Sequence, residues 1–204
     1  DVFVGGVRSG LTDSGGDGND TFKGGEGAEI IDMGAGANTI SAGGGADTIT
    51  VSGTSDTVDG GRGDDVIYAS LAGYLNVAGG DGYDRLILSP FTSSEPIEFN
   101  DHELVVKTNG GRREIDFNDS LDVIKLTDSA AQTTISSAAN ASWGSTGMSL
   151  DAAGVLDVTN AHLVGPLATF DIAASGIHGT LNTELAGRTV QNRGTAGVSG
   201  DENI

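Results

Sequence analysis

The chain has 204 residues, enough for one or two domains with a modest core, and its 29 Asp and Glu against 10 Lys and Arg give a formal net charge of −19. So acidic a surface repels nucleic acid and anionic membranes, which excludes nucleic acid as a partner, and it attracts cations. The sequence has no cysteine, so disulfides and thiolate metal sites are excluded, and no apolar run is long enough for membrane insertion. A disordered acidic coat has the same composition, so the choice depends on periodicity.

Residues 1–14 form an N-terminal lead-in without the charged start and apolar centre of a signal peptide. From Gly15 the chain divides into units of nine residues that run to Tyr68. A ten-residue insert, ASLAGYLNVA, follows, and the frame returns as GGDGYDRLI at residues 79–87. The six units before the insert are GGDGNDTFK, GGEGAEIID, MGAGANTIS, AGGGADTIT, VSGTSDTVD and GGRGDDVIY.

Two positions of the nine-residue unit keep one chemical kind of side chain. The eighth position is apolar, with Phe22, Ile31, Ile40, Ile49, Val58, Ile67 and Leu86. The sixth position carries an oxygen, with Asp20, Glu29, Asn38, Asp47, Asp56, Asp65 and Asp84. Each unit therefore predicts a glycine-rich turn followed by a three-residue strand with one inward apolar side chain.

Such short strands bury their apolar side chains only by stacking, as parallel ladders roughly 4.8 Å apart. Stacking also aligns the sixth-position side chains in columns, which repel one another unless a cation lies between them. The block 15–88 contains no His or Cys, so its ligands are carboxylate and carbonyl oxygens. Oxygen ligands select a hard cation, and flexible loops rich in oxygen favour calcium over magnesium.

The units match the pattern G-G-x-G-x-D-x-U-x and resemble the RTX nonapeptide repeats of bacterial proteins exported by type I secretion. The resemblance covers residues 15–88, a little over a third of the chain. It implies an all-β fold, a parallel β-roll with two nonapeptides per coil and calcium held between loops on the same side. It also implies export of an unfolded chain, which folds when it meets external calcium.

On this resemblance, repeats two apart share an ion, and we expect several Ca²⁺ ions, roughly three to five. In decreasing order of expected strength, the pairs of side-chain ligands are Asp47–Asp65, Asp65–Asp84, Asp20–Asn38, Glu29–Asp47 and Asn38–Asp56. The neutral Asn38, the longer Glu29 and the glycine-poor loop VSGTSD weaken the last three pairs. The expected backbone contributors are Gly16, Gly18, Gly25, Gly27, Gly34, Gly36, Gly43, Gly45, Gly61, Gly63, Gly80 and Gly82.

Beyond the repeats, short alternating strands are predicted in LILSPF, IEFND, ELVVKTN, REIDF and LDVIKL, with a hairpin turn in KTNGGRRE. We expect residues 89–128 to cap the open end of the roll, where an exposed ladder edge would invite aggregation. A small separate sheet domain is the alternative.

Residues 129–204 are rich in Ala, Ser, Thr and Gly, and TTISS, LDVTN, ATFDIAA and RTVQN predict further strands. We expect a β-rich region, such as a solenoid-like layer without ions, against the alternative of a low-complexity linker. The last residues, GVSGDENI at 197–204, fit the nonapeptide frame as a partial repeat, which predicts that the chain is a fragment of a larger repetitive protein.

The sequence shows no catalytic constellation, because His102, His162 and His178 form no H-E-x-x-H motif and WGSTG is not a nucleophile elbow. We therefore expect no enzyme in this chain. The favoured function is a calcium-binding structural segment of a secreted bacterial surface layer, adhesin or matrix, with itself or other surface proteins as partners. The alternative is the C-terminal RTX secretion and stabilising domain of a hydrolase or epimerase whose catalytic domain lies outside this chain.

Overall fold

The structure, a computed structural model, describes residues 1–4, 12–100, 102–137, 147–152, 155–160, 162–163, 169–173, 176–178, 182–183 and 189–192. Every regular element among these residues is a β-strand, which confirms the all-β prediction. In the same residues there is no helix with the length and apolarity to span a membrane. The chain forms two compact units, one of residues 1–89 with 115–124, the other of residues 90–114 with 125–204.

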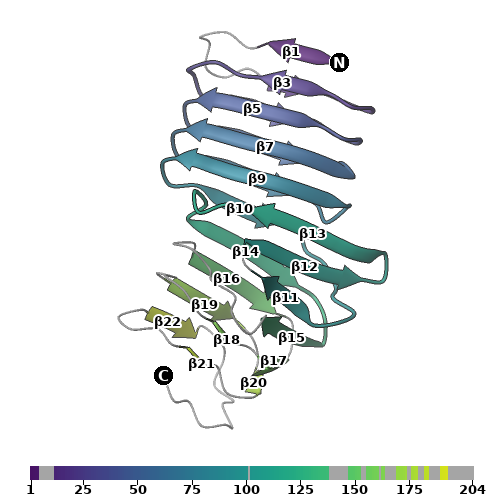
Figure 1. The fold of residues 1–204 in the computed structure, drawn as a ribbon, viewed down its shortest axis with the longest axis vertical. Coiled ribbons are helices and arrows are strands. Elements are labelled where there is room, and N and C mark those ends of the chain that lie inside the picture. The colour runs from purple at the N-terminus through teal and green to yellow at the C-terminus, as the bar shows by residue number, and fades with distance from the viewer. Residues whose placement is uncertain are drawn as a thin grey trace. The chain divides into compact units, whose positions relative to one another are not determined.

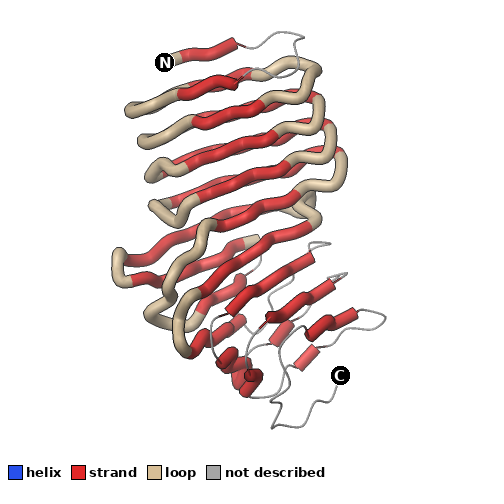
Figure 2. Tube along the Cα trace, turned by 180° about the vertical axis from the view of Figure 1, so that it is seen from behind, coloured by secondary structure: helices blue, strands red, loops and turns tan. Residues whose placement is uncertain are grey.

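The first unit is a parallel β-solenoid of about four turns. Successive strands alternate between two sheets, and each strand pairs in parallel with the strand two further along the chain (Figures 1 and 2). One sheet contains β1 (Val2–Val4), β3 (Thr21–Lys23), β5 (Thr39–Gly44), β7 (Ser55–Arg62) and β9 (Tyr74–Asp81). The other contains β2 (Thr12–Ser14), β4 (Ile30–Asp32), β6 (Thr48–Val51), β8 (Val66–Ala69) and β10 (Arg85–Leu88).

The register of these strands stacks the eighth-position side chains into a core. Ile40 lies opposite Phe22 on one side and Val58 on the other, while Ile49 lies opposite Ile67 in the second sheet. All seven apolar side chains predicted to be inward are at most 2 % exposed. Full burial of one such side chain stabilises the fold by about 1.5–3 kcal/mol, so each coil that stacks adds to the stability of the roll.

The ten-residue insert is a further half-coil of the roll. Its second half belongs to β9, which pairs with β7 so that Val77 lies opposite Val58 and Leu75 opposite Asp56. The insert therefore occupies the place of one nonapeptide and absorbs a single extra residue. The alternation between the two sheets continues, and the next strand, β10, returns to the second sheet with Leu86 in the core.

The second unit carries the predicted strands and several that were not predicted. Its strands, with two that continue into residues 115–124 of the first unit, are β11 (Ile97–Asn100), β12 (Glu103–Thr108), β13 (Gly111–Phe117), β14 (Val123–Asp128), β15 (Gln132–Ser137), β16 (Gly147–Ala152), β17 (Val155–Asn160), β18 (His162–Leu163), β19 (Thr169–Ala173), β20 (Gly176–His178), β21 (Asn182–Thr183) and β22 (Thr189–Asn192). Strands β16, β18, β20 and β21 have no counterpart in the predictions.

The later strands of the second unit again pair in parallel. β15 pairs with β17 and β17 with β20, while β16 pairs with β19 and β19 with β22. The expectation of a β-rich region after residue 128 is therefore confirmed for the described residues. The partial repeat at 197–204 lies outside them.

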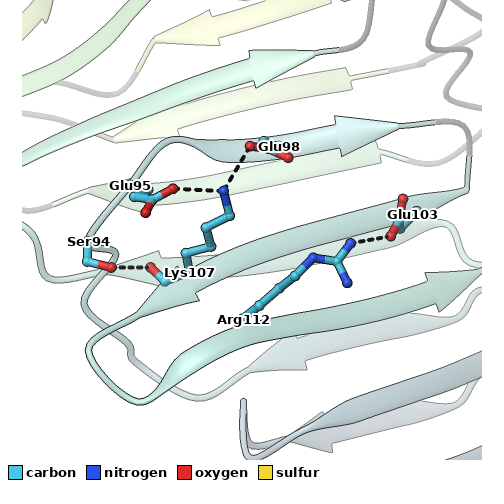
Figure 3. Close-up of polar contacts among 6 residues, drawn as sticks. All are labelled: Ser94, Glu95, Glu98, Glu103, Lys107 and Arg112. Atoms are coloured by element: carbon cyan, nitrogen blue, oxygen red, sulfur yellow. Dashed lines mark hydrogen bonds and ion pairs between the residues drawn. The ribbon is translucent and has the colours of Figure 1, made fainter.

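Several ion pairs of the second unit involve the hairpin of β12 and β13 (Figure 3). Lys107 Nζ lies 2.7 Å from a carboxylate oxygen of Glu95 and 3.4 Å from one of Glu98, and Arg112 contacts Glu103 at 3.0 Å. These side chains are partly exposed, so solvent screens the pairs and they contribute little to stability. These pairs join neighbouring strands of the sheet, whereas the predicted metal ligands lie in the first unit.

Candidate metal centre

The seven sixth-position side chains are all buried in the structure. Their exposed fractions run from 0 % at Asp65 and Asp84 to 3 % at Asp20 and Asp56. No Lys or Arg of the described residues pairs with Asp47, Asp65 or Asp84. Burying unpaired carboxylates costs a protein several kcal/mol each, so these residues point to a function that outweighs the cost.

The parallel register sorts these side chains into two columns, one for each row of loops. Column 1 consists of Asp20, Asn38 and Asp56, and it ends where Leu75 lies opposite Asp56. Column 2 consists of Glu29, Asp47, Asp65 and Asp84.

Hydrogen bonds from the backbone fix one oxygen of each side chain along the column. The N–H of Glu29 donates to Oδ1 of Asp47 at 2.7 Å, that of Asp47 to Asp65 at 2.7 Å, and that of Asp65 to Asp84 at 2.9 Å. Column 1 has the same arrangement, since the N–H of Asn38 donates to Oδ1 of Asp56 at 3.0 Å. Each side chain is thereby held against the loop one coil earlier in the chain.

The second carboxylate oxygen distinguishes the columns. The Oδ2 atoms of Asp47, Asp65 and Asp84 are buried and have no hydrogen-bond partner. In column 1, Oδ2 of Asp20 is also buried and unpartnered, but the neutral Asn38 follows it and Oδ2 of Asp56 accepts a hydrogen bond from the N–H of Gly53 at 2.9 Å. Column 2 therefore offers a line of buried oxygens that a cation would satisfy.

Backbone carbonyl oxygens face the same space as these carboxylate oxygens. A Cβ atom placed on Gly60 would lie 2.4 Å from Oδ2 of Asp65 and 2.5 Å from the carbonyl oxygen of Gly79. At Gly60, only glycine leaves this space open. An enclosure of carboxylate and carbonyl oxygens suits calcium, which takes six to eight oxygen ligands, so the residues fit the ion that the sequence predicts.

The loops reach this shape through glycines with positive φ at the second and fourth positions. Gly61 and Gly63 have φ of 106° and 118°, and a Cβ on Gly61 would lie 2.0 Å from the carbonyl oxygen of Gly43. The predicted glycines with the same sign of φ are Gly16, Gly18, Gly34, Gly36, Gly43, Gly45, Gly80 and Gly82. Gly25 and Gly27 are not among them, so the loop that precedes Glu29 has a different backbone conformation.

The electrostatics of column 2 centre on Asp65. Burial raises the pKa of Asp65 from 3.8 to about 7; the hydrogen bond from the N–H of Asp47 opposes this rise, and the charges of Asp47, Asp84 and Asp64 add to it. Burial likewise raises the pKa of Asp47 and of Asp84. Without a cation, Asp65 is therefore partly protonated near neutral pH.

Sequence reasoning missed Asp122, which continues column 2. The N–H of Asp84 donates to Oδ2 of Asp122 at 2.7 Å, and the N–H of Asp122 donates to the carbonyl oxygen of Asp84 at 2.9 Å. The signal in the sequence is FNDSLDVIK at 117–125, where Asp122 and the buried Ile124 stand at the sixth and eighth positions of a unit without glycine.

Stacked nine-residue half-coils, positive-φ glycines and a buried column of carboxylates define a calcium-binding β-roll. Residues 14–40 and 33–67 match the RTX calcium-binding nonapeptide repeat, in four copies. This segment is an RTX β-roll, a structural repeat that binds several calcium ions and is not itself catalytic. RTX repeats occur in extracellular bacterial proteins of type I secretion. No curated protein and no solved structure matches the chain.

Proposed function

We propose that the chain is a calcium-binding structural segment of a secreted bacterial surface or extracellular protein, and that it folds when it meets external calcium. The observation that carries the proposal is the line of buried, unpartnered carboxylate oxygens on Asp47, Asp65 and Asp84. No lysine or arginine of the described residues forms an ion pair with these carboxylates, so we infer that a bound divalent cation neutralises them.

Within the roll, we assign the strongest sites to Asp47 with Asp65 and to Asp65 with Asp84. Both pairs supply unpartnered carboxylate oxygens, and the loops around them carry Gly43, Gly45, Gly61, Gly63, Gly80 and Gly82 with positive φ. The site of Glu29 with Asp47 is weaker, because Gly25 and Gly27 lack this conformation.

Column 1 supports weaker sites. Asn38 is neutral, so its pairs with Asp20 and Asp56 offer one carboxylate each. The second oxygen of Asp56 already accepts a backbone hydrogen bond, and Leu75 supplies no ligand on the far side. The charge and the geometry thus both support column 2 as the edge that binds calcium more strongly.

Calcium would act by coupling binding to folding. Without the ion, repulsion and desolvation among the column 2 carboxylates and the entropy of the glycines oppose the folded roll. With the ion, the free energy of binding becomes free energy of folding. A chain that stays unfolded at low calcium and folds at high calcium suits export as an extended chain.

The test is circular dichroism of the full chain with calcium, with EGTA, and with magnesium in place of calcium. We expect strong β-sheet signal with calcium, loss of most of the signal from the roll with EGTA, and little recovery with magnesium. Spectra that EGTA leaves unchanged would contradict folding coupled to calcium. Equal recovery with magnesium would contradict the assignment of the ion.

The surface role rests on the same segment and on the Ala, Ser, Thr and Gly-rich residues after 128. Light scattering of the chain with added calcium tests it. Large ordered assemblies would support a surface layer or matrix. A persistent monomer would contradict self-association, and the adhesin or stabilising-domain roles would then be favoured.

A further inference from the structure

Column 2 does not end with the last recognisable repeat. The loop of residues 118–122 stacks on the loop of residues 79–84, and both belong to the first unit. Three hydrogen bonds join the loops: the N–H of Gly80 donates to Oγ of Ser120 at 2.9 Å, that of Asp84 to Oδ2 of Asp122 at 2.7 Å, and that of Asp122 to the carbonyl oxygen of Asp84 at 2.9 Å.

The stacked loop reproduces the oxygen environment of a repeat without a repeat's sequence. At Gly60, a Cβ atom would meet Oδ2 of Asp65 at 2.4 Å and the carbonyl oxygen of Gly79 at 2.5 Å. At Gly79, it would meet Oδ2 of Asp84 at 2.6 Å and the carbonyl oxygen of Ser120 at 2.6 Å. Ser120 thus places a carbonyl oxygen where a glycine of the next repeat would place its own.

The buried side chain of Asp84 gives a second, independent indication that an ion binds here. This side chain is 0 % exposed, and its Oδ2 atom has no hydrogen-bond partner. The carbonyl oxygen of Ser120 adjoins the same space and cannot donate a hydrogen bond to it, whereas a cation would bind both oxygens. Asp122 adds a second carboxylate that is half-buried in the same stack. The local arrangement therefore matches that of the Asp65–Asp84 pair one coil earlier, with the same hydrogen bond along the column.

We propose that Asp84 and Asp122, with the carbonyl oxygen of Ser120, form an additional calcium site that closes the C-terminal end of the roll. This inference rests on the proposed function, because it extends the same column by one ion. The family match ends at residue 67, and neither the nonapeptide pattern nor the glycine positions identify residues 118–122.

The proposed ion has a structural consequence of its own. It joins residues 38 positions apart in the chain, whereas the pairs inside the roll are 18 or 19 positions apart. A metal ion that closes a longer loop removes more conformational freedom from the unfolded chain. The site would therefore fix residues 115–124 to the roll and order its last coil.

The experiment is a calcium titration by isothermal calorimetry on the full chain and on two variants, Asp122→Asn and Asp119→Asn. Asp119→Asn is the matched control, since it removes the same charge from an exposed side chain of the same loop. Asp122→Asn keeps an oxygen that can accept the hydrogen bond from Asp84. We expect Asp122→Asn to bind one calcium ion fewer per chain, with Asp119→Asn unchanged.

The outcomes separate this site from the proposed function. If the wild-type chain binds no calcium, both ideas fail. If the wild type binds calcium and Asp122→Asn binds as many ions with the same affinity, the additional site alone is overturned. An equal loss in both variants would also overturn it, because the effect would then belong to the charge of the loop and not to Asp122.

Hydrogen exchange gives a second, local readout, in the wild type and in Asp122→Asn. The amides of Asp122 and Val123 both donate to the carbonyl oxygen of Asp84. In the wild type, exchange at these amides should slow when calcium is added, and in Asp122→Asn at saturating calcium they should exchange faster while the amides of β7 stay protected. Exchange at Asp122 and Val123 that does not respond to calcium in the wild type would overturn the site.

Discussion

The two edges of the roll share one fold and differ in chemistry. Both are built from stacked nine-residue half-coils with the same hydrogen bond from each loop to the next. Column 2 has unpartnered oxygens on three successive aspartates. Column 1 has one such oxygen, on Asp20, followed by the neutral Asn38, the hydrogen-bonded Asp56 and finally Leu75. The apolar core decides the fold, and on the proposed function the sixth position sets how strongly each edge binds calcium.

The largest expected effect separates the columns directly. Asp65 is shared by the two strongest proposed sites, so Asp65→Ala should weaken overall calcium binding by about a hundredfold, on the basis of about tenfold or more for each site. Asp56→Ala, in column 1, should cost less than about tenfold. Calorimetric titration of both variants measures the difference, and equal losses would show that the two edges bind calcium alike.

The pH dependence of calcium binding should also come from column 2. The pKa of Asp65 is raised in the folded chain from 3.8 to about 7, so its protonated form favours the calcium-free fold. That contribution to stability is complete below pH 3.8 and is lost as the pH rises through about 7. Calcium needs the carboxylate, so its affinity should fall by about tenfold for each pH unit below that pKa.

The measurement is calcium affinity between about pH 8 and pH 5.5 for the wild type and for Asp65→Asn. The variant lacks the titrating group, and most of the pH dependence should disappear with it. A pH profile that Asp65→Asn leaves intact would place the proton elsewhere in the roll.

Much of this arrangement follows from the nine-residue period. The period places Ile67 in the core and Asp65 in a loop, because a two-sheet coil leaves those positions no other environment. The place of the insert in the roll was harder to predict from the sequence, since its extra residue shifts the register by one. The pairing of β7 with β9, which puts Val77 opposite Val58, shows that it is a half-coil. Asp122 was missed because its loop has Asn118 and Ser120 where glycines mark the other repeats.

The backbone of the loops offers a smaller contrast, between the first loop of the roll, which contains Gly16, and a loop inside it, which contains Gly61. Gly61 and Gly16 both have positive φ, so an alanine at either position is strained by about 1–3 kcal/mol. At Gly61 the added Cβ would also lie 2.0 Å from the carbonyl oxygen of Gly43, whereas at Gly16 there is nothing within 4 Å. Gly61→Ala should therefore lower the free energy of unfolding by at least about 1 kcal/mol more than Gly16→Ala.

Urea unfolding with calcium, followed by circular dichroism, compares these two variants. The extra cost at Gly61 is a test of how closely the loops of column 2 stack. Similar unfolding midpoints for the two variants would mean that the loops separate easily, and that close stacking does not hold the carbonyl oxygens in place.

The smallest expected effect is a gain, in Asn38→Asp. The Oδ1 atom of Asn38 accepts a hydrogen bond from the N–H of Asp20 at 3.0 Å, and its buried Nδ2 atom has no hydrogen-bond partner. An aspartate keeps the first oxygen and replaces the amide nitrogen with a carboxylate oxygen, which gives column 1 the composition of column 2. We expect calcium binding at this edge to strengthen by only a few-fold, roughly 0.5–1 kcal/mol, because Oδ2 of Asp56 still accepts the hydrogen bond from Gly53.

In EGTA, Asn38→Asp should be less stable than the wild type, since it adds a buried charge. Calorimetry with calcium and urea unfolding with EGTA measure the two effects. A variant that is less stable in EGTA and binds calcium no more tightly would show that the loop geometry of column 1, and not its missing charge, limits calcium binding at this edge.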